Sequence, residues 1–221
     1  MKKFQQIKNN SILLCFVLLI TQSVFAQTVE KWFVNMPDGF NPTLSKQNRL
    51  ELLEYYKAGQ GDSVTNRYGN QARLVAFDSI NQCVVVKNTS STMFEMKMFN
   101  LEDSSTIIGL ISTVCAPVCQ SYIQFYDTAW NSMPIQFTMP KAIEWLNKDS
   151  LETKNLDKQW VGNVLENSFI TLTFDAANNT IIAQNNSLKF MTEIDRKLFQ
   201  PLMTEKPFVY KLNGRTWVQQ P

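Results

Sequence analysis

The sequence predicts an α+β fold, an antiparallel β-sheet built from a meander plus hairpins, with helices packed on one side. Residues 107–114 are apolar on both pleat faces, as in a strand that is buried on both sides. Residues 121–126 instead alternate, which indicates a strand with one wetter face. Asn213-Gly214 separates two β-type segments, so a two-residue hairpin is expected there, with Tyr210 directly opposite Trp217.

Two helices are expected before the sheet. Val29, Trp32, Phe33 and Met36 recur at helical spacing until Pro37 stops the pattern. A second helix is expected to open at Asn41-Pro42, to bury Leu50, Leu53 and Tyr56, and to end at Gly59. Its solvated face would carry Arg49, Glu51, Glu54 and Lys57.

The period of the pattern changes to two from residue 71, which begins the meander. Segments 71–77 and 83–86 flank a short loop and predict a hairpin. Segment 92–99 alternates in the same way and places Glu95 and Lys97 on its outer face. With the two strands at 107–126, this makes a meander of about five strands.

The second half of the chain alternates between helices and hairpins. The patterns predict helical segments at 140–146, 160–165 and 192–198, a hairpin at 170–182, and the closing hairpin at 208–218.

The N-terminus is typical of a cleaved signal peptide. Lys2, Lys3 and Lys8 precede a short apolar run, and small Ala26 offers a cleavage position. We therefore expect residues 1–26 to be a signal peptide and residues 27–221 to be a single α+β domain. No later stretch has the roughly 20 apolar residues that a spanning helix needs, so the mature chain is expected to be periplasmic or secreted, without a transmembrane segment.

Charge and composition exclude several classes of function. The mature chain would hold 18 basic and 19 acidic residues, and without a basic cluster a nucleic-acid partner is not expected. There is no histidine, which removes Ser-His-Asp and Cys-His nucleophile schemes and histidine-containing metal sites. No glycine-rich phosphate loop is present, because no two of the seven glycines are adjacent. No metal and no cofactor are therefore assigned.

The cysteines are the residues with chemistry of their own. Cys115 and Cys119 flank Pro117, which requires a turn, so the pair is a disulfide candidate once the protein is exported. As a structural bridge it would close a five-residue loop and stabilise the fold by roughly 2 kcal/mol. A redox role would need a lowered thiol pKa from a nearby cation or helix N-terminus. Cys83 lies in an apolar strand and is interpreted as a buried small hydrophobe, which leaves the disulfide connectivity open.

Binding candidates are few. Tyr122, Tyr126 and Trp130 lie near one strand face and could contact a partner or a glycan, although core packing explains them as well. Carboxylate pairs such as Asp38 with Asp62 lie in polar, loop-like sequence, where Asp is a preferred turn residue, so no catalytic residue is assigned.

Five segments, in this order behind a signal peptide, carry a resemblance to an exported family of Bacteroidetes that is catalogued as a domain of unknown function. They are WFVNMP at 32–37, NRL at 48–50, VTNR at 64–67, TVCAPVC at 113–119 and FYDTAW at 125–130. The resemblance implies the compartment and the single-domain extent. It carries no activity, substrate or active site to this chain.

These observations favour a non-catalytic periplasmic or secreted binding or envelope-associated module. Its partner would be an envelope protein or a glycan, and its oligomeric state is open. One alternative is a histidine-free thiol-disulfide enzyme that uses Cys115 and Cys119, and another is an assembly or structural factor of the outer membrane.

Overall fold

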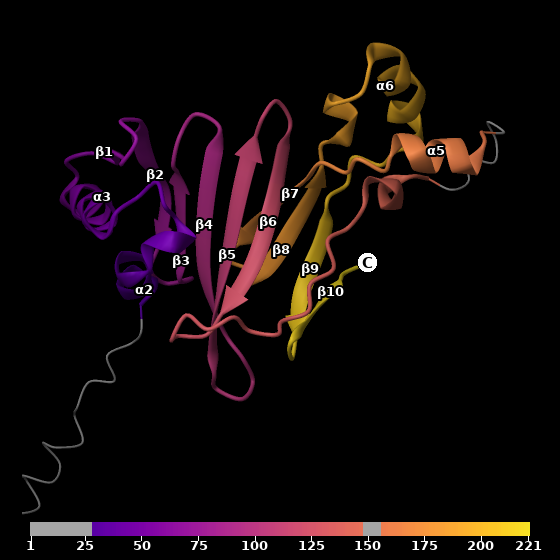
Figure 1. Ribbon diagram of the computed structural model, residues 1–221. Coiled ribbons are helices and arrows are strands. Elements are labelled where there is room, and N and C mark those ends of the chain that lie inside the picture. Colours follow the sequence, from indigo (N-terminus) through magenta and orange to yellow (C-terminus); the bar gives the residue numbers. More distant parts are fainter. Residues whose placement is uncertain (1–27, 148–155) are drawn as a thin grey trace, which may run out of the picture.

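The computed structural model describes residues 28–147 and 156–221, and they form two antiparallel sheets with helices (Figure 1). The signal peptide expected at 1–26 lies outside these residues. The six-stranded sheet contains β1 (Ser63–Thr65), β2 (Gln71–Asp78), β3 (Cys83–Lys87), β4 (Thr92–Asn100), β5 (Thr106–Cys115) and β6 (Cys119–Tyr126). The four-stranded sheet contains β7 (Ile170–Asp175), β8 (Thr180–Asn185), β9 (Phe208–Asn213) and β10 (Thr216–Gln219).

The α-helices are short, and single 3-10 turns lie between them. The α-helices are α2 (Val29–Asn35), α3 (Lys46–Ala58), α5 (Lys158–Val164) and α6 (Glu193–Phe199). The 3-10 turns are η1 (Asp38–Phe40), η2 (Ala142–Trp145), η3 (Ser187–Lys189) and η4 (Gln200–Leu202). In the described ranges no helix is long and apolar enough to cross a membrane.

The six-stranded sheet contains the predicted meander of about five strands and one further strand, β1, at its edge, and its strands are paired in sequence order. The α+β class and the antiparallel sheet are therefore confirmed. Strand β5 is buried along most of its length on both faces, as its apolar run predicted. At Gly109 the backbone approaches a facing ring so closely that an added Cβ would lie 2.8 Å from Phe174.

Each face of this sheet has its own core. Helices α2 and α3 pack over β1 to β4 and enclose a core that includes Phe33, Leu52 and Phe94. The four-stranded sheet covers the opposite face, and the core between the sheets includes Phe125 and Trp217. A third cluster joins η2, α5, α6 and η4, away from α2 and α3 (Figure 1). The sequence predicted helices on one side; it gave no sign that a second sheet covers the other.

Helix α3 begins later than the sequence suggested. Ser45 caps it by accepting a hydrogen bond from the Asn48 backbone N–H, and Gly59 ends it with a φ of +64°. Arg49, expected on the solvated face, is fully buried, and its guanidinium donates to the backbone oxygens of Leu44 and Met36. The buried carbonyls of Leu44 and Met36 need a hydrogen-bond donor, and Arg49 supplies it, although the helical periodicity of the sequence predicted that Arg49 would be exposed.

The closing hairpin exists, but its turn lies one residue further along than expected. Gly214 and Arg215 form the turn, and positive φ is confined to Gly214. Trp217 therefore pairs with Leu212 and not with Tyr210, which pairs with Gln219. The prediction of a Tyr210–Trp217 pair was wrong because the position of the two-residue turn sets the register of the hairpin. When the turn moves by one residue, every pair along the two strands changes.

Candidate functional site

Two hollows in the described part of the chain lie beside β6. Two adjoining depressions of about 750 Å³ and 500 Å³ share Met139. We call them the β6 groove. The larger is lined by Gln120, residues 139–141, Ile143, Gly162, Asn163 and residues 165–169; the smaller is lined by residues 122–124, Phe137 and Met139.

Strand alternation explains why β6 presents Tyr122 outward. Ser121 and Phe125 point into the interior between the two sheets and are buried. Tyr122 points the other way, where helices α2 and α3 do not reach, and its side chain is 61% exposed. The same strand thus contributes to the core and carries an exposed aromatic ring.

The other two predicted binding residues lie deeper. Tyr126 is buried, and its ring centroid lies 4.5 Å from Phe40 and 6.2 Å from Trp130. Trp130 stacks on Phe40 at 5.1 Å and meets Trp32 edge to face at 6.4 Å. These rings fasten the loop after β6 to η1 and α2, so Tyr122 differs from the other two in having its ring open to solvent.

The remaining walls of the groove come from distant parts of the chain. Phe137 and Met139 belong to an extended segment that Gln136 holds against β10. The backbone carbonyl of Gln136 accepts from the Trp217 N–H, and its backbone N–H donates to the Arg215 carbonyl, both at 2.8 Å. Ser168, on the opposite wall, accepts a hydrogen bond from the Ala142 backbone N–H at 2.8 Å. Both walls are therefore fixed by hydrogen bonds between segments far apart in sequence, for which the sequence offered no local signal.

The polar side chains of the groove include four amides, together with the charged Lys141 and Glu166 and the hydroxyl of Ser168. Gln124, Asn163 and Asn167 are exposed, and Gln120 is half-buried. Across residues 28–147 and 156–221 the structure places no hydrogen-bond partner against these four side chains. Each amide can both donate and accept; Gln124 lines the smaller depression together with Tyr122, and the other three line the larger one.

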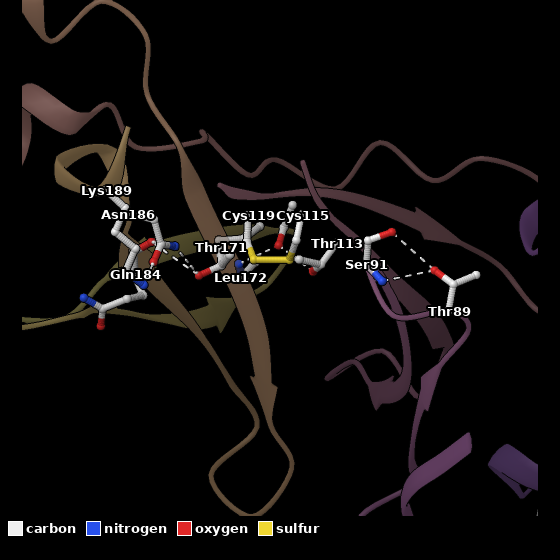
Figure 2. The surroundings of a disulfide bond; sticks show 11 residues. Thr89, Ser91, Thr113, Cys115, Cys119, Thr171, Leu172, Gln184, Asn186 and Lys189 are labelled. Carbon is white, nitrogen blue, oxygen red and sulfur yellow. Dashed lines mark hydrogen bonds between the residues drawn. A yellow bond between two sulfur atoms is a disulfide. The ribbon is translucent and has the colours of Figure 1, made fainter. Parts of the chain in front are cut away.

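Cys115 ends β5, and Cys119 begins β6 directly before Gln120 of the β6 groove. Figure 2 shows the bond between their sulfur atoms. Cys115 and Cys119 form a disulfide, with their Cα atoms 3.8 Å apart across the turn at Pro117. The Cys115 backbone N–H donates to the Ser91 carbonyl at 2.8 Å, which ties this turn to the β3–β4 turn. Cys83 is buried, and that burial raises the pKa of its thiol to about 12.

Glu95 and Lys97 correct another expectation. Both were expected on the outer face of β4, but they are 3% and 0% exposed and lie between the two sheets. The Glu95 carboxylate accepts from the Phe174 backbone N–H at 2.9 Å, and the Lys97 amine donates to the Asn81 and Ala176 carbonyls at 2.7 and 3.2 Å. Burial raises the pKa of Glu95 to about 7 and lowers the pKa of Lys97.

Ser121 completes this contact between the sheets. Its hydroxyl accepts from the Leu172 backbone N–H at 2.9 Å and shares a hydrogen bond with Thr113 at 2.7 Å. Strand β7 is an edge strand, so the backbone groups of its outer edge need partners other than a neighbouring strand. The buried polar residues of β4 and β6 supply those partners. In the described ranges no three Cys, Asp or Glu side chains gather in a group that could hold a metal ion.

Comparison with known proteins gives a fold and a family. No curated protein matches the chain. Among solved structures, the chain is similar to a domain of an uncharacterized protein from Porphyromonas gingivalis W83, with 18% identity and a TM-score of 0.71 over 87% of this chain and 97% of that one. At this identity the likeness concerns the fold alone. The family model described as "Protein of unknown function (DUF3256)" matches residues 21–217, and the chain belongs to that family.

Proposed function

We propose that this protein is a non-catalytic binding module of the periplasm or cell exterior, and that the β6 groove binds a glycan. One observation carries the proposal: the exposed Tyr122 ring lines the same groove as four amide side chains that have no protein partner among the described residues. Ligand sites combine apolar and aromatic walls with a few polar groups that fix the ligand's orientation.

The chemistry of the groove suits a sugar chain. A pyranose ring has an apolar C–H face that can lie on an aromatic ring, and hydroxyls around its edge that donate and accept hydrogen bonds. Tyr122 and Phe137 supply aromatic surface, whereas Gln120 and Asn167 supply groups that donate and accept. The two hollows adjoin at Met139, so a ligand of several sugar units could occupy both.

The proposed compartment rests on two further features. A disulfide persists in oxidising environments such as the periplasm, and the Cys115–Cys119 bond is formed. Residues 1–26 have the pattern of a signal peptide, and we propose that residues 27–221 form one exported domain. The intact mass of protein recovered from the periplasm or medium should correspond to a chain that begins at Gln27. A mass that retains residues 1–26 in a membrane fraction would contradict the proposal.

Two other roles compete with glycan binding. Thiol-disulfide exchange through Cys115 and Cys119 requires a stabilised thiolate. The neighbouring β3–β4 turn contributes only the hydroxyls of Thr89 and Ser91, and the cation drawn in the same view, Lys189, donates to the Asn186 side chain at 2.8 Å (Figure 2). A structural or assembly role at the outer membrane would instead require a protein partner. A thiol titration with and without reductant tests the first, and co-purification of an envelope protein tests the second.

Isothermal titration calorimetry with soluble tetrasaccharides tests the proposal directly. The probes are β1,4-linked N-acetylglucosamine, β1,4-linked glucose and α1,4-linked glucose. At least one should bind, and Tyr122→Ala should weaken that binding at least tenfold while Tyr122→Phe retains it. Tyr68→Ala is the matched control, because Tyr68 is 67% exposed and lies outside the groove. Failure of all three probes to bind, or equal effects of Tyr122→Ala and Tyr68→Ala, would refute the glycan site.

A further inference from the structure

One edge of strand β6 has no neighbouring strand, because β6 is the last strand of the six-stranded sheet (Figure 1). The chain itself covers the C-terminal end of this edge, where the Met133 N–H donates to the Phe125 carbonyl at 2.9 Å. Pro134 comes next and has no N–H, and Gln136 is already bonded to β10. The chain therefore leaves the edge of β6 at Met133.

The next position along this edge is Ile123. Residues two apart in an antiparallel strand direct their N–H and C=O groups to the same edge, so Ile123 directs both groups the way Phe125 directs its carbonyl. In the described ranges neither backbone group of Ile123 has a hydrogen-bond partner. Ser121, the preceding position on this edge, is fully buried, so the free stretch is one residue long. An unpaired donor and acceptor on a strand edge can pair with one residue of another extended peptide.

This free edge faces the β6 groove. The smaller depression is lined by Tyr122, Ile123 and Gln124, together with Phe137 and Met139. Because side chains alternate along a strand, Tyr122 and Gln124 point to one face of the sheet and Ile123 to the other. A hollow that touches all three consecutive residues therefore lies along the strand edge, where it meets both the Ile123 backbone groups and the exposed Tyr122 ring.

We propose that the glycan of the β6 groove carries a peptide, as the glycan strands of peptidoglycan do, and that one residue of this peptide pairs with Ile123. Such a ligand presupposes the glycan site proposed above and specifies the class of glycan. The peptide residue accepts a hydrogen bond from the Ile123 N–H and donates one to the Ile123 C=O. An N-acetyl group cannot do both, because the N–H and C=O of a trans amide point in opposite directions. Tyr122 is adjacent to Ile123, so the sugar next to the peptide lies on its ring.

Calorimetry with two matched probes tests the peptide contact. The first probe is the disaccharide N-acetylglucosaminyl-N-acetylmuramic acid, and the second is the same disaccharide with L-alanyl-D-isoglutamine attached to its lactyl carboxyl group. Each probe carries one carboxylate, so their net charges are equal. The peptide-bearing probe should bind at least tenfold more tightly. Tyr122→Ala should weaken the binding of both probes at least tenfold, and Tyr68→Ala should weaken neither.

Amide hydrogen exchange, followed by NMR, locates the contact on β6. In the free protein the Ile123 amide should exchange rapidly, whereas the Gln124 amide, which faces β5, should be protected. The peptide-bearing probe should slow exchange at Ile123 at least tenfold, and the disaccharide alone should not. This measurement uses the unmodified protein, so it does not depend on the folding of a variant.

The outcomes separate the peptide contact from the glycan site. If a tetrasaccharide binds but the two disaccharide probes bind equally, the peptide contact is overturned and the glycan site stands. The same holds if the Ile123 amide is already protected in the free protein, or if the peptide-bearing probe leaves its exchange unchanged. If neither the tetrasaccharides nor the disaccharide probes bind, both proposals fall.

Discussion

Glu95 should make the stability of this protein depend on pH between about 4.5 and 7. Its carboxyl group lies between the two sheets and accepts one hydrogen bond, from the Phe174 backbone N–H at 2.9 Å. Burial raises its pKa from 4.5 to about 7, and that hydrogen bond opposes the rise only in part. The folded state therefore holds the Glu95 proton more tightly than the unfolded state does.

The sign and the magnitude follow from linkage. Because the folded-state pKa is the higher one, the contribution of Glu95 to stability is fully present below pH 4.5 and is lost as pH rises through about 7. At about 1.4 kcal/mol per pKa unit, the rise corresponds to a loss of about 3 kcal/mol across this window. Above it, the folded protein carries a buried carboxylate at that cost.

Replacement of Glu95 by Gln isolates this effect. The amide oxygen can still accept from Phe174, but the side chain no longer titrates. Any constant cost of the buried amide group cancels when the variant and the unmodified protein are compared across pH. The unfolding free energy of the variant, minus that of the unmodified protein, should rise by about 3 kcal/mol between pH 4.5 and pH 8.

Urea denaturation, followed by tryptophan fluorescence at a series of pH values, measures that difference. Glu54→Gln on the exposed surface of α3 serves as the control, and its curve should run parallel to that of the unmodified protein. A Glu95→Gln curve that also runs parallel would show that Glu95 does not titrate in this window, and the reasoning from its burial would fail.

Three further predictions concern stability, and each is measured by chemical denaturation. Gly214→Val should lower the unfolding free energy by on the order of 1–3 kcal/mol, because φ at this position is +57° and a β-branched residue disfavours that backbone conformation. Gly39→Val, at a position where φ is not positive, is the control. Equal effects of the two substitutions would contradict the argument. Cys115→Ser combined with Cys119→Ser should cost about 2 kcal/mol and leave tetrasaccharide binding intact, whereas an unchanged midpoint would mean that the bridge does not stabilise the fold. Arg49→Met should cost on the order of 3 kcal/mol, because buried carbonyls lose their donor, and a loss below 1 kcal/mol would show that water replaces the guanidinium.

Local signals in the sequence account for most of the elements. Pro37 and Gly59 mark the ends of α2 and α3, and Thr192 caps α6, because these residues act on the backbone next to them. The disulfide was predictable for the same reason, since Pro117 places a turn between two nearby cysteines. The start of α3 was missed because Asn41-Pro42 and Ser45 both resemble helix starts and only the packed structure chooses between them.

The candidate site was predictable only in part. Alternation along β6 correctly separated Tyr122 from Ser121 and Phe125, but it could not show that helices cover the far strands of the sheet and leave Tyr122 open. The other walls of the β6 groove come from residues 137–143 and 162–169, brought to β6 by contacts between segments far apart in sequence. No local pattern marks such residues.

The misplacement of Glu95 and Lys97 has a physical cause that reaches beyond one strand. Alternation shows that these two residues share a face of β4, and a charged face is normally a solvated one. Here that face meets the edge of a second sheet, where the Phe174 N–H and the Ala176 carbonyl would be buried without partners. A buried charge is costly, but it can satisfy a strand edge that an apolar side chain cannot. We infer that Glu95 and Lys97 hold the four-stranded sheet in its position on the first one, so a charged pair on a central strand can indicate a covering edge strand as well as solvent.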